Sequence, residues 1–158
     1  MRHWRAFKQQ PIPGRKIQMS KRIKVDITVP NQTKYLGVIG RIGESMAYSL
    51  KGYQGNRREL AYHLNLVLTE ALANAICHAN SCDPDKDVRV LITASDQDLT
   101  IKVYDQGEGF DIEALAKLKA QKHDEGGRGI QIIFKLMDQV KYLQEGNRNV
   151  LEMVKYFH

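Results

Sequence analysis

Apolar residues recur at helical spacing along Leu60–Asn80, near the middle of the chain. They fall at three- and four-residue steps, and no proline or glycine interrupts the stretch, which predicts a helix with one apolar face. The positions on this face are Leu60, Leu64, Val67, Leu68, Ala71, Leu72, Ala75 and Ile76. We expect the rest of the chain to be organised around this helix.

Five other stretches have the patterning of strands, most clearly the first, in which polar and apolar residues alternate. The expected strands are Arg22–Val29, Val88–Ala94, Leu99–Tyr104, Val140–Gln144 and Val150–Phe157. Pro30 ends the first strand. Four polar residues at positions 95–98 join the second and third strands into a hairpin, and Gly146-Asn147 joins the last two strands.

A second helix is expected between the first strand and the central helix. Asn31 or Thr33 can cap it, and it runs to about Lys51. Its expected inner side consists of Leu36, Ile39, Met46, Ala47 and Leu50. Within it, Gly37, Gly40 and Gly43 recur at every third position, which weakens the helix but leaves a bare stripe where another backbone can pack closely.

The remaining helices are expected in the last third of the chain. Asp111–Ala120 is predicted as a short helix, and a glycine-rich segment at positions 126–129 opens another helix that runs to about Met137. Without the short helix, the elements follow in the order β-α-α-β-β-α-β-β, and there is no internal repeat. Helices that cover one face of a mixed or antiparallel sheet predict a two-layer α/β sandwich.

Charge is concentrated at one end of the chain. The 158 residues include 24 basic and 18 acidic ones, and residues 1–22 hold seven of the basic and none of the acidic residues. The other 136 residues therefore carry 17 basic against 18 acidic groups, a net charge of −1, so we expect no nucleic-acid-binding surface. We interpret residues 1–21 as a basic, flexible tail and residues 22–158 as one domain.

Nothing in the sequence predicts a membrane span or a disulfide framework. No uninterrupted apolar run approaches the roughly 18 residues that a span needs. The two cysteines, Cys77 and Cys82, fit a reducing compartment and hence a cytoplasmic protein. Together with His78 they suggest a metal site, but their spacing matches no standard zinc pattern, so we interpret them as structural or incidental residues.

Glu70 and Asn74 are the first candidate site residues. Four residues apart on a helix, they point to one spot on the same side, among apolar neighbours. Burying a carboxylate and an amide without partners costs free energy. A bound cation with phosphate is one explanation; a solvated helix edge is the simpler one, and the pair alone favours it.

A glycine-rich loop, Asp105–Phe110, follows the third strand directly. A carboxylate fixed at a strand end can accept a hydrogen bond from an amino group on a ligand ring, and the adjacent Gly107 and Gly109 allow a ligand to approach the backbone. Asp and Gly are also the ordinary residues of a plain turn, and the two interpretations are evenly balanced.

The glycines before the last helix indicate an anion site. They leave backbone N–H groups free at a helix start, where the helix dipole adds partial positive charge that suits phosphates. The segment concerned is Gly126, Gly127, Arg128, Gly129 and Ile130. A flexible joint with a glycine cap is the alternative.

Taken together, these three motifs resemble the N, G1 and G2 boxes of the GHKL ATPase/kinase superfamily, which has the Bergerat nucleotide-binding fold. The motifs are ExxxN on a helix (Glu70, Asn74), DxGxGF after a strand (Asp105–Phe110) and GGRGI opening a helix (Gly126–Ile130). Each motif alone is a weak signal, but three in the right order on the right elements are a strong one. Within the superfamily, the chain from about Arg22 to Tyr156 is most similar to the anti-sigma-factor serine kinases.

The resemblance implies a role for each motif. Asn74 would supply an oxygen to Mg²⁺, Asp105 would accept from the adenine amino group of ATP or ADP with Gly109 nearby, and Glu70 would be the general base. Gly127 and Gly129 would give backbone room at the phosphates, and Asp111–Glu125 would be a lid over them. The remaining motif residues counted as nucleotide-binding are Gly107, Phe110, Gly126, Arg128 and Ile130.

The resemblance also implies partners. An antagonist protein with an acceptor serine would be the substrate, a sigma factor or similar regulator would be held and released, and the chain would form a homodimer through its sheet or its first-helix surface. The segment between the second and third boxes is short and lacks the prolines, serines and threonines often seen there. A nucleotide-gated binding module with little turnover is therefore the alternative. A sensor histidine kinase is disfavoured, because about 20 residues before the first strand cannot form its dimerisation helices.

Overall fold

The computed structural model describes residues 21–109, 111 and 128–157. The expected tail, apart from Lys21, and the expected short helix, apart from Asp111, lie outside these residues. The strands are β1 (Ile23–Pro30), β2 (Asp87–Ala94), β3 (Asp98–Asp105), β4 (Gln139–Glu145) and β5 (Arg148–Tyr156). The helices are η1 (Thr33–Tyr35), α1 (Leu36–Ser49), α2 (Arg57–Ala73), η2 (Asn74–Ala79) and α4 (Arg128–Leu136).

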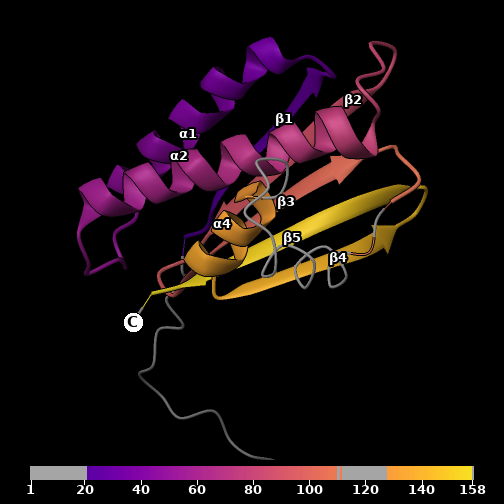
Figure 1. The fold of residues 1–158 in the computed structure, drawn as a ribbon. Coiled ribbons are helices and arrows are strands. Elements are labelled where there is room, and N and C mark those ends of the chain that lie inside the picture. Colours follow the sequence, from indigo (N-terminus) through magenta and orange to yellow (C-terminus); the bar gives the residue numbers. More distant parts are fainter. Residues whose placement is uncertain (1–20, 110, 112–127, 158) are drawn as a thin grey trace, which may run out of the picture.

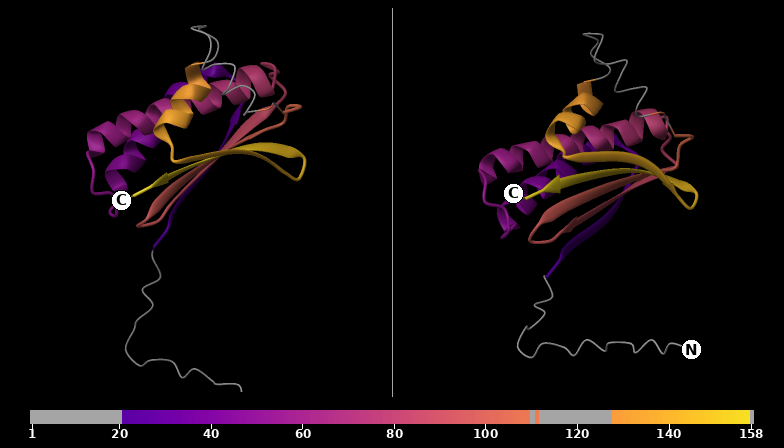
Figure 2. Two further views of the ribbon diagram at one scale, coloured as in Figure 1. Left: turned by 60° about the horizontal axis from the view of Figure 1, so that its bottom comes forward. Right: turned by 90° about the horizontal axis from the view of Figure 1, so that it is seen from below.

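The strands form one sheet in the order β1-β2-β3-β5-β4, and each neighbouring pair is antiparallel. Helices α1, α2 and α4 cover one face of this sheet, as Figures 1 and 2 show from three directions. The expected two-layer α/β sandwich and the expected element order are thus confirmed, and the sheet is antiparallel rather than mixed.

The core lies between α2 and the inner face of the sheet. Strand alternation sends Val90 and Ile92 of β2, and Ile101 and Val103 of β3, toward the helices, where all four are almost fully buried. The opposite face carries polar pairs such as Arg89 with Asp26. The alternation continues to the end of β3, so that Asp105 also points to the helix side, beyond the apolar residues of the same strand.

The glycine stripe of α1 packs within the chain. A side chain on Gly43 would meet Leu64 and Leu68 of α2, and one on Gly40 would meet Asn65 and Thr69. These glycines let α1 and α2 approach closely. The backbone expected to pack closely on this stripe is therefore that of α2 at Gly43, whereas Gly37 has open space around it.

Asn31 does not cap a helix, contrary to the expectation. The α1 N-cap is Tyr35, and neither it nor Gln32 before η1 makes a side-chain cap bond. Asn31 is instead 3% exposed, and its side chain donates to the carbonyl of Asp83 at 2.9 Å. This bond satisfies the buried amide and joins the end of β1 to the loop after η2.

The central helix begins earlier and changes character before its expected end. Asn56 caps α2 by accepting from the amide of Glu59 at 3.1 Å, and the α-helix gives way at Asn74 to the wider π-helical turns of η2. The segment Arg57–Ala79 is long and apolar enough, by length and composition, to cross a membrane, a test that the core helix of a globular domain also passes. Here its apolar face packs on the sheet.

Candidate functional site

A buried carboxylate, Asp105, stands at the centre of the candidate site. It is 2% exposed, and its Oδ1 accepts from the amide of Gly107 at 2.9 Å and from Asn149 Nδ2 at 3.0 Å. Its Oδ2 accepts from the hydroxyl of Tyr142 at 2.9 Å. We call Asp105, Gly107, Tyr142 and Asn149 the Asp105 cluster. Such bonds hold the carboxylate in one orientation.

The sheet register brings the cluster together. Asp105 of β3 lies opposite Asn149 of β5, and Tyr142 of β4 lies opposite Leu151, two residues further along β5 on the same face. Burial raises the pKa of the Tyr142 hydroxyl, and the Asp105 carboxylate raises that pKa further. The hydroxyl therefore stays protonated at neutral pH and acts as the donor to Asp105.

The glycines beside Asp105 are needed for close packing. A side chain on Gly107 would collide with the carbonyl of Ala79 in η2, so the loop lies directly against the end of the central helix. Gly109 has φ +86, in the left-handed region, and lies beside Asn149. Asn149 Nδ2 also donates to the carbonyl of Gly107 at 2.8 Å. The loop is thus fixed from both sides.

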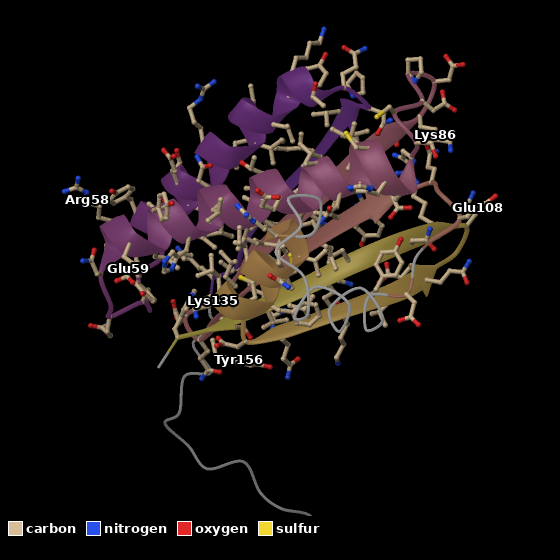
Figure 3. All side chains as sticks on the ribbon, in the orientation of Figure 1. Arg58, Glu59, Lys86, Glu108, Lys135 and Tyr156 are labelled. Atoms are coloured by element: carbon tan, nitrogen blue, oxygen red, sulfur yellow. The ribbon has the colours of Figure 1, made fainter. Side chains whose placement is uncertain are left out.

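A second buried amide, Asn80, fastens the loop to the helix layer. It is fully buried, accepts from the amide of Gln106 at 2.8 Å, and donates to Asn31 Oδ1 and the carbonyl of Asp87 at 3.1 Å each. One side chain thereby links the loop after β3, the end of β1 and the start of β2. In Figure 3, Glu108 of this loop lies at the same end of the molecule as Lys86, and Arg58 and Glu59 mark the opposite end of α2.

The other motif residues meet where α2 passes the start of α4. A side chain on Gly129 would collide with Glu70 Oε2, so the Glu70 carboxylate lies against the Gly129 backbone. We call Glu70, Asn74 and Gly129 the Glu70–Gly129 junction. It brings the first and third motifs together and places a carboxylate at the start of a helix, where the helix dipole favours negative charge.

Asn74 connects the two groups. It is the first residue of η2, one turn beyond Glu70, and it lines a cavity of about 10 Å³ whose wall includes Asp105 and Tyr142. Its amide nitrogen is buried and has no hydrogen-bond partner among the residues that the structure describes. An unsatisfied buried amide in a native site calls for an explanation, and a bound polar ligand provides one.

Three of the expected site residues, Phe110, Gly126 and Gly127, lie outside the described residues. Arg128, the first described residue of α4, is exposed, whereas Ile130 is 1% exposed and packs in the core. A ligand contact by Ile130 would therefore involve its backbone. The structure thus brings together Asp105, Gly107 and Gly109 at one place and Glu70, Asn74 and Gly129 at another, along one helix.

Sequence reasoning missed Tyr142, Asn149 and Asn80. A signal for Asn149 was available, because it occupies an inward position of β5, in step with Leu151 and Met153. Tyr142 likewise keeps step with Val140 of β4. Asn80 gave no such signal, since its partners come from three separate segments.

Cys77 lies within η2 and Cys82 lies in the loop after it, and both are exposed. Burial raises the pKa of the Cys77 thiol, and its contact with the Cys82 thiol raises that pKa further. Within the described part of the chain, no group of three or more His, Cys, Asp and Glu side chains could hold a metal ion.

Comparison with known proteins identifies related sequences. The sequence profile of a family described as the histidine kinase-like ATPase domain matches residues 41–155, which is well over half of the chain. The match includes all three motifs.

Several curated proteins of similar length also match. A protein named serine-protein kinase RsbW from Bacillus subtilis (strain 168) is 28% identical over 142 residues, covering 85% of this chain and 86% of the relative. Proteins of the same name from Listeria monocytogenes serovar 1/2a and Oceanobacillus iheyensis are 29% and 25% identical over 144 and 135 residues. They cover 85% and 78% of this chain, and the chain covers 88% and 80% of them.

Proposed function

Because the chain belongs to the family of histidine kinase-like ATPase domains, we propose that it is an ATP-dependent serine protein kinase that acts as an anti-sigma factor or partner-switching regulator. The relatives named serine-protein kinase support this activity. The observation that carries the proposal is the continuous line of polar groups from Asp105 through Asn74 to Glu70 and Gly129. The Asp105 end of this line suits the purine base of a nucleotide, and the Gly129 end suits its phosphates.

The Asp105 cluster would bind the base of ATP or ADP. Asp105 has acceptor oxygens in a buried, apolar surrounding, which favours a ring with an exocyclic amino group such as adenine. The bonds from Asn149 and from the Gly107 amide to Oδ1 fix the carboxylate before any ligand arrives, and this preorganisation lowers the entropic cost of binding. Gly107 and Gly109 keep the loop close to the base.

Asn74 would hold Mg²⁺. Magnesium prefers oxygen ligands and keeps several waters, so one amide oxygen is sufficient where phosphates supply the others. The buried Asn74 amide, whose nitrogen has no partner among the described residues, fits this role, because an amide can present its oxygen where its nitrogen lies now. When bound, the ion would neutralise charge on the phosphates.

The start of α4 would bind the phosphates. Gly129 has only hydrogen where other residues carry a side chain, so its backbone can approach an anion that lies beside Glu70. Arg128 is exposed at the first described turn of the helix and is available for a charge-assisted contact. The helix dipole adds to the attraction for negative charge.

Glu70 would act on the serine hydroxyl that accepts the phosphoryl group. Its carboxylate lies at the start of α4, next to the proposed phosphate position, and can orient a serine hydroxyl or accept its proton during transfer. The substrate we propose is an antagonist protein with an acceptor serine, and the second partner is a sigma factor or similar regulator. Such a regulator works in the cytoplasm.

A homodimer is the proposed assembly. An open groove of about 420 Å³ lies between α1 and the edge strand β1, lined by Val25, Val38, Ile42 and Met46 among others. Val38 is 47% exposed, and β1, which pairs with β2 alone among the described strands, presents a sheet edge beside this apolar surface that favours association. Light scattering would return twice the mass of the chain; a mass of one chain across micromolar concentrations would contradict the dimer.

The kinase activity can be tested by phosphoryl transfer. The full-length protein is incubated with Mg-ATP labelled in the γ-phosphate and a candidate antagonist, alongside the same antagonist with its acceptor serine changed to alanine. We expect label on serine in the first mixture and none in the second. If the protein binds Mg-ATP but labels none of the candidate antagonists recovered from its own cell, the kinase proposal is wrong and a nucleotide-gated binding module remains.

A further inference from the structure

Tyr142 is already bonded to the Asp105 carboxylate, which the proposed function assigns to the purine base of the nucleotide. Its hydroxyl donates to Asp105 Oδ2, and its side chain forms part of the wall of the cavity that Asp105 and Asn74 also line. We propose that Tyr142 is a gate of the nucleotide site, whose hydroxyl must leave Asp105 before a purine amino group can bind there. This inference rests on the proposed function.

The cavity is too small for a base as it stands. Its volume of about 10 Å³ is that of roughly one water, whereas sites for small organic ligands measure about 300–1,000 Å³. The rest of its wall consists of Ala71, Asn74, Ala75, Val103 and Leu151. A ring can enter only if part of this wall moves.

Most of the wall is held in place by the core. Ala71, Val103 and Leu151 are 1–3% exposed and pack between α2 and the central strands. The Oδ1 side of Asp105 is held by Asn149 and the backbone of Gly107. Moving any of these groups would break core packing or the loop that carries Asp105.

Tyr142 is the member of the wall that can move at least cost. It lies on β4, the edge strand of the sheet, which pairs with β5 alone among the described strands. Its side chain is only partly buried, and the residues on either side of it, Lys141 and Leu143, are exposed. The ring can therefore swing toward the open edge while the sheet stays intact.

The gate also makes the site selective. A ligand must replace the Tyr142 hydroxyl as the donor to the Asp105 carboxylate, which requires an exocyclic amino group on the base. A base with a carbonyl at that position would place its own acceptor oxygen against the acceptor oxygen of Asp105 and would be rejected. Because burial and Asp105 raise the pKa of Tyr142, the hydroxyl remains a donor at neutral pH, and the competition does not depend on pH there.

Replacing the hydroxyl alone tests the gate. Tyr142→Phe keeps the ring but removes the competing donor, so the affinity for Mg-ADP, measured by calorimetry, should rise about tenfold, as expected for the loss of a hydrogen bond to a charged group. Tyr104→Phe is the matched control, because Tyr104 is a buried tyrosine on the opposite face of the same sheet, under Arg89. Its affinity should match that of the unmodified protein.

The outcomes separate the gate from the function. If the unmodified protein binds Mg-ADP and Tyr142→Phe binds it equally or more weakly, Tyr142 is a fixed wall and the gate is wrong. If neither binds Mg-ADP, Mg-ATP or the analogous guanine nucleotides, the nucleotide site itself is wrong, and the gate with it. A purely structural role would lower the melting temperature of Tyr142→Phe without raising its affinity.

A measurement on the unmodified protein guards against a misfolded variant. With ¹³C-labelled tyrosine, the ring signal of Tyr142 should shift toward that of a solvent-exposed ring when Mg-ADP is added, and the Tyr104 signal should stay where it is. A Tyr142 signal that keeps its buried position in the saturated complex would overturn the gate.

Discussion

The Asp105 cluster and the Glu70–Gly129 junction lie along the same helix but differ in how their polar groups are satisfied. At the cluster, both oxygens of a carboxylate that is 2% exposed accept hydrogen bonds from three segments of the chain. At the junction, the buried amide nitrogen of Asn74 has no partner in the described structure, and the Glu70 carboxylate lies against the backbone of Gly129.

This difference indicates that the two places are built for different tasks. The cluster is part of the folded core, so changes there should lower stability as well as alter nucleotide binding. The junction contributes few bonds to the fold and leaves polar groups available to a ligand, so changes there should affect chemistry more than stability. The following predictions test this division, beginning with the largest effect.

Glu70→Gln should reduce serine phosphorylation the most. The amide keeps the shape of the carboxylate but cannot accept a proton, and general-base catalysis contributes about 10²- to 10⁴-fold to a rate. We expect a loss of rate in that range, with Mg-ADP affinity and melting temperature nearly unchanged. Glu59→Gln, on the same helix with a side chain 63% exposed, is the control and should keep full activity. A Glu70→Gln protein that retained the normal rate would remove the catalytic role.

Asn80→Ala should cost the most stability. The change leaves the backbone amide of Gln106, the carbonyl of Asp87 and the side-chain oxygen of Asn31 without their partner, and each such loss costs about 1–3 kcal/mol. We expect the free energy of unfolding in urea to fall by about 2–4 kcal/mol. Gln32→Ala, an exposed position beside Asn31, should change it by less than about 0.5 kcal/mol. Equal effects of the two changes would mean that the buried amide does not fasten the loop.

Gly107→Ala should lower the stability of the protein, and Gly37→Ala should raise it. A methyl group at Gly107 meets the carbonyl of Ala79, so the backbone must shift at a cost of about 1–3 kcal/mol. Position 37 is in a helix with open space around it, and alanine there should stabilise the protein by about 0.5–1 kcal/mol. Thermal unfolding measures both. A Gly107→Ala protein as stable as the parent would show that the loop does not press on η2.

The outer face of the sheet should give the smallest effect. Lys102 donates to Glu145 at 3.0 Å, and this bond holds the pKa of Glu145 below its ordinary value. Stability from this pair is therefore present above the unfolded pKa of the carboxyl and lost as the pH falls through the lowered, folded value. Since Glu145 is 43% exposed, we expect the pair to stabilise the fold by only about 0.2–1 kcal/mol. The free energy of unfolding of Glu145→Gln should therefore fall less on acidification than that of the unmodified protein. An unchanged acid profile in that variant would mean that the pair contributes nothing.

Patterns local to one element predicted most of the fold. Alternation and helical spacing placed all five strands and three helices, since period and burial are directly linked in each. The ends of elements were less predictable: α2 begins at Arg57 because Asn56 caps it, and the α-helix yields to π-helical turns at Asn74. Asn31 looked like a cap because its residue type is typical of one, but its partner lies 49 positions away.

The candidate site was predictable to the same extent. Glu70, Asp105 and Gly129 belong to motifs that are short in sequence, and the structure brings Glu70 to Gly129 as expected. Tyr142 and Asn149 join Asp105 only through the register of β4 on β5 and β5 on β3, which no single stretch of sequence encodes. The inward positions of Tyr142 and Asn149 follow from strand alternation, but their hydrogen bonds to Asp105 can be seen only in the folded sheet.

The central claim is that a nucleotide binds across α2, between the Asp105 cluster and the Glu70–Gly129 junction, and calorimetry with Mg-ADP tests it most directly. Asp105→Asn keeps the shape of the side chain and an oxygen for Asn149 and Gly107, while the Tyr142 hydroxyl can accept from the new amide, so the fold should persist. We predict one Mg-ADP per chain for the unmodified protein and at least about tenfold weaker binding for Asp105→Asn, since a hydrogen bond to a charged group is lost. Equal affinity of the two folded proteins for Mg-ADP would contradict the account.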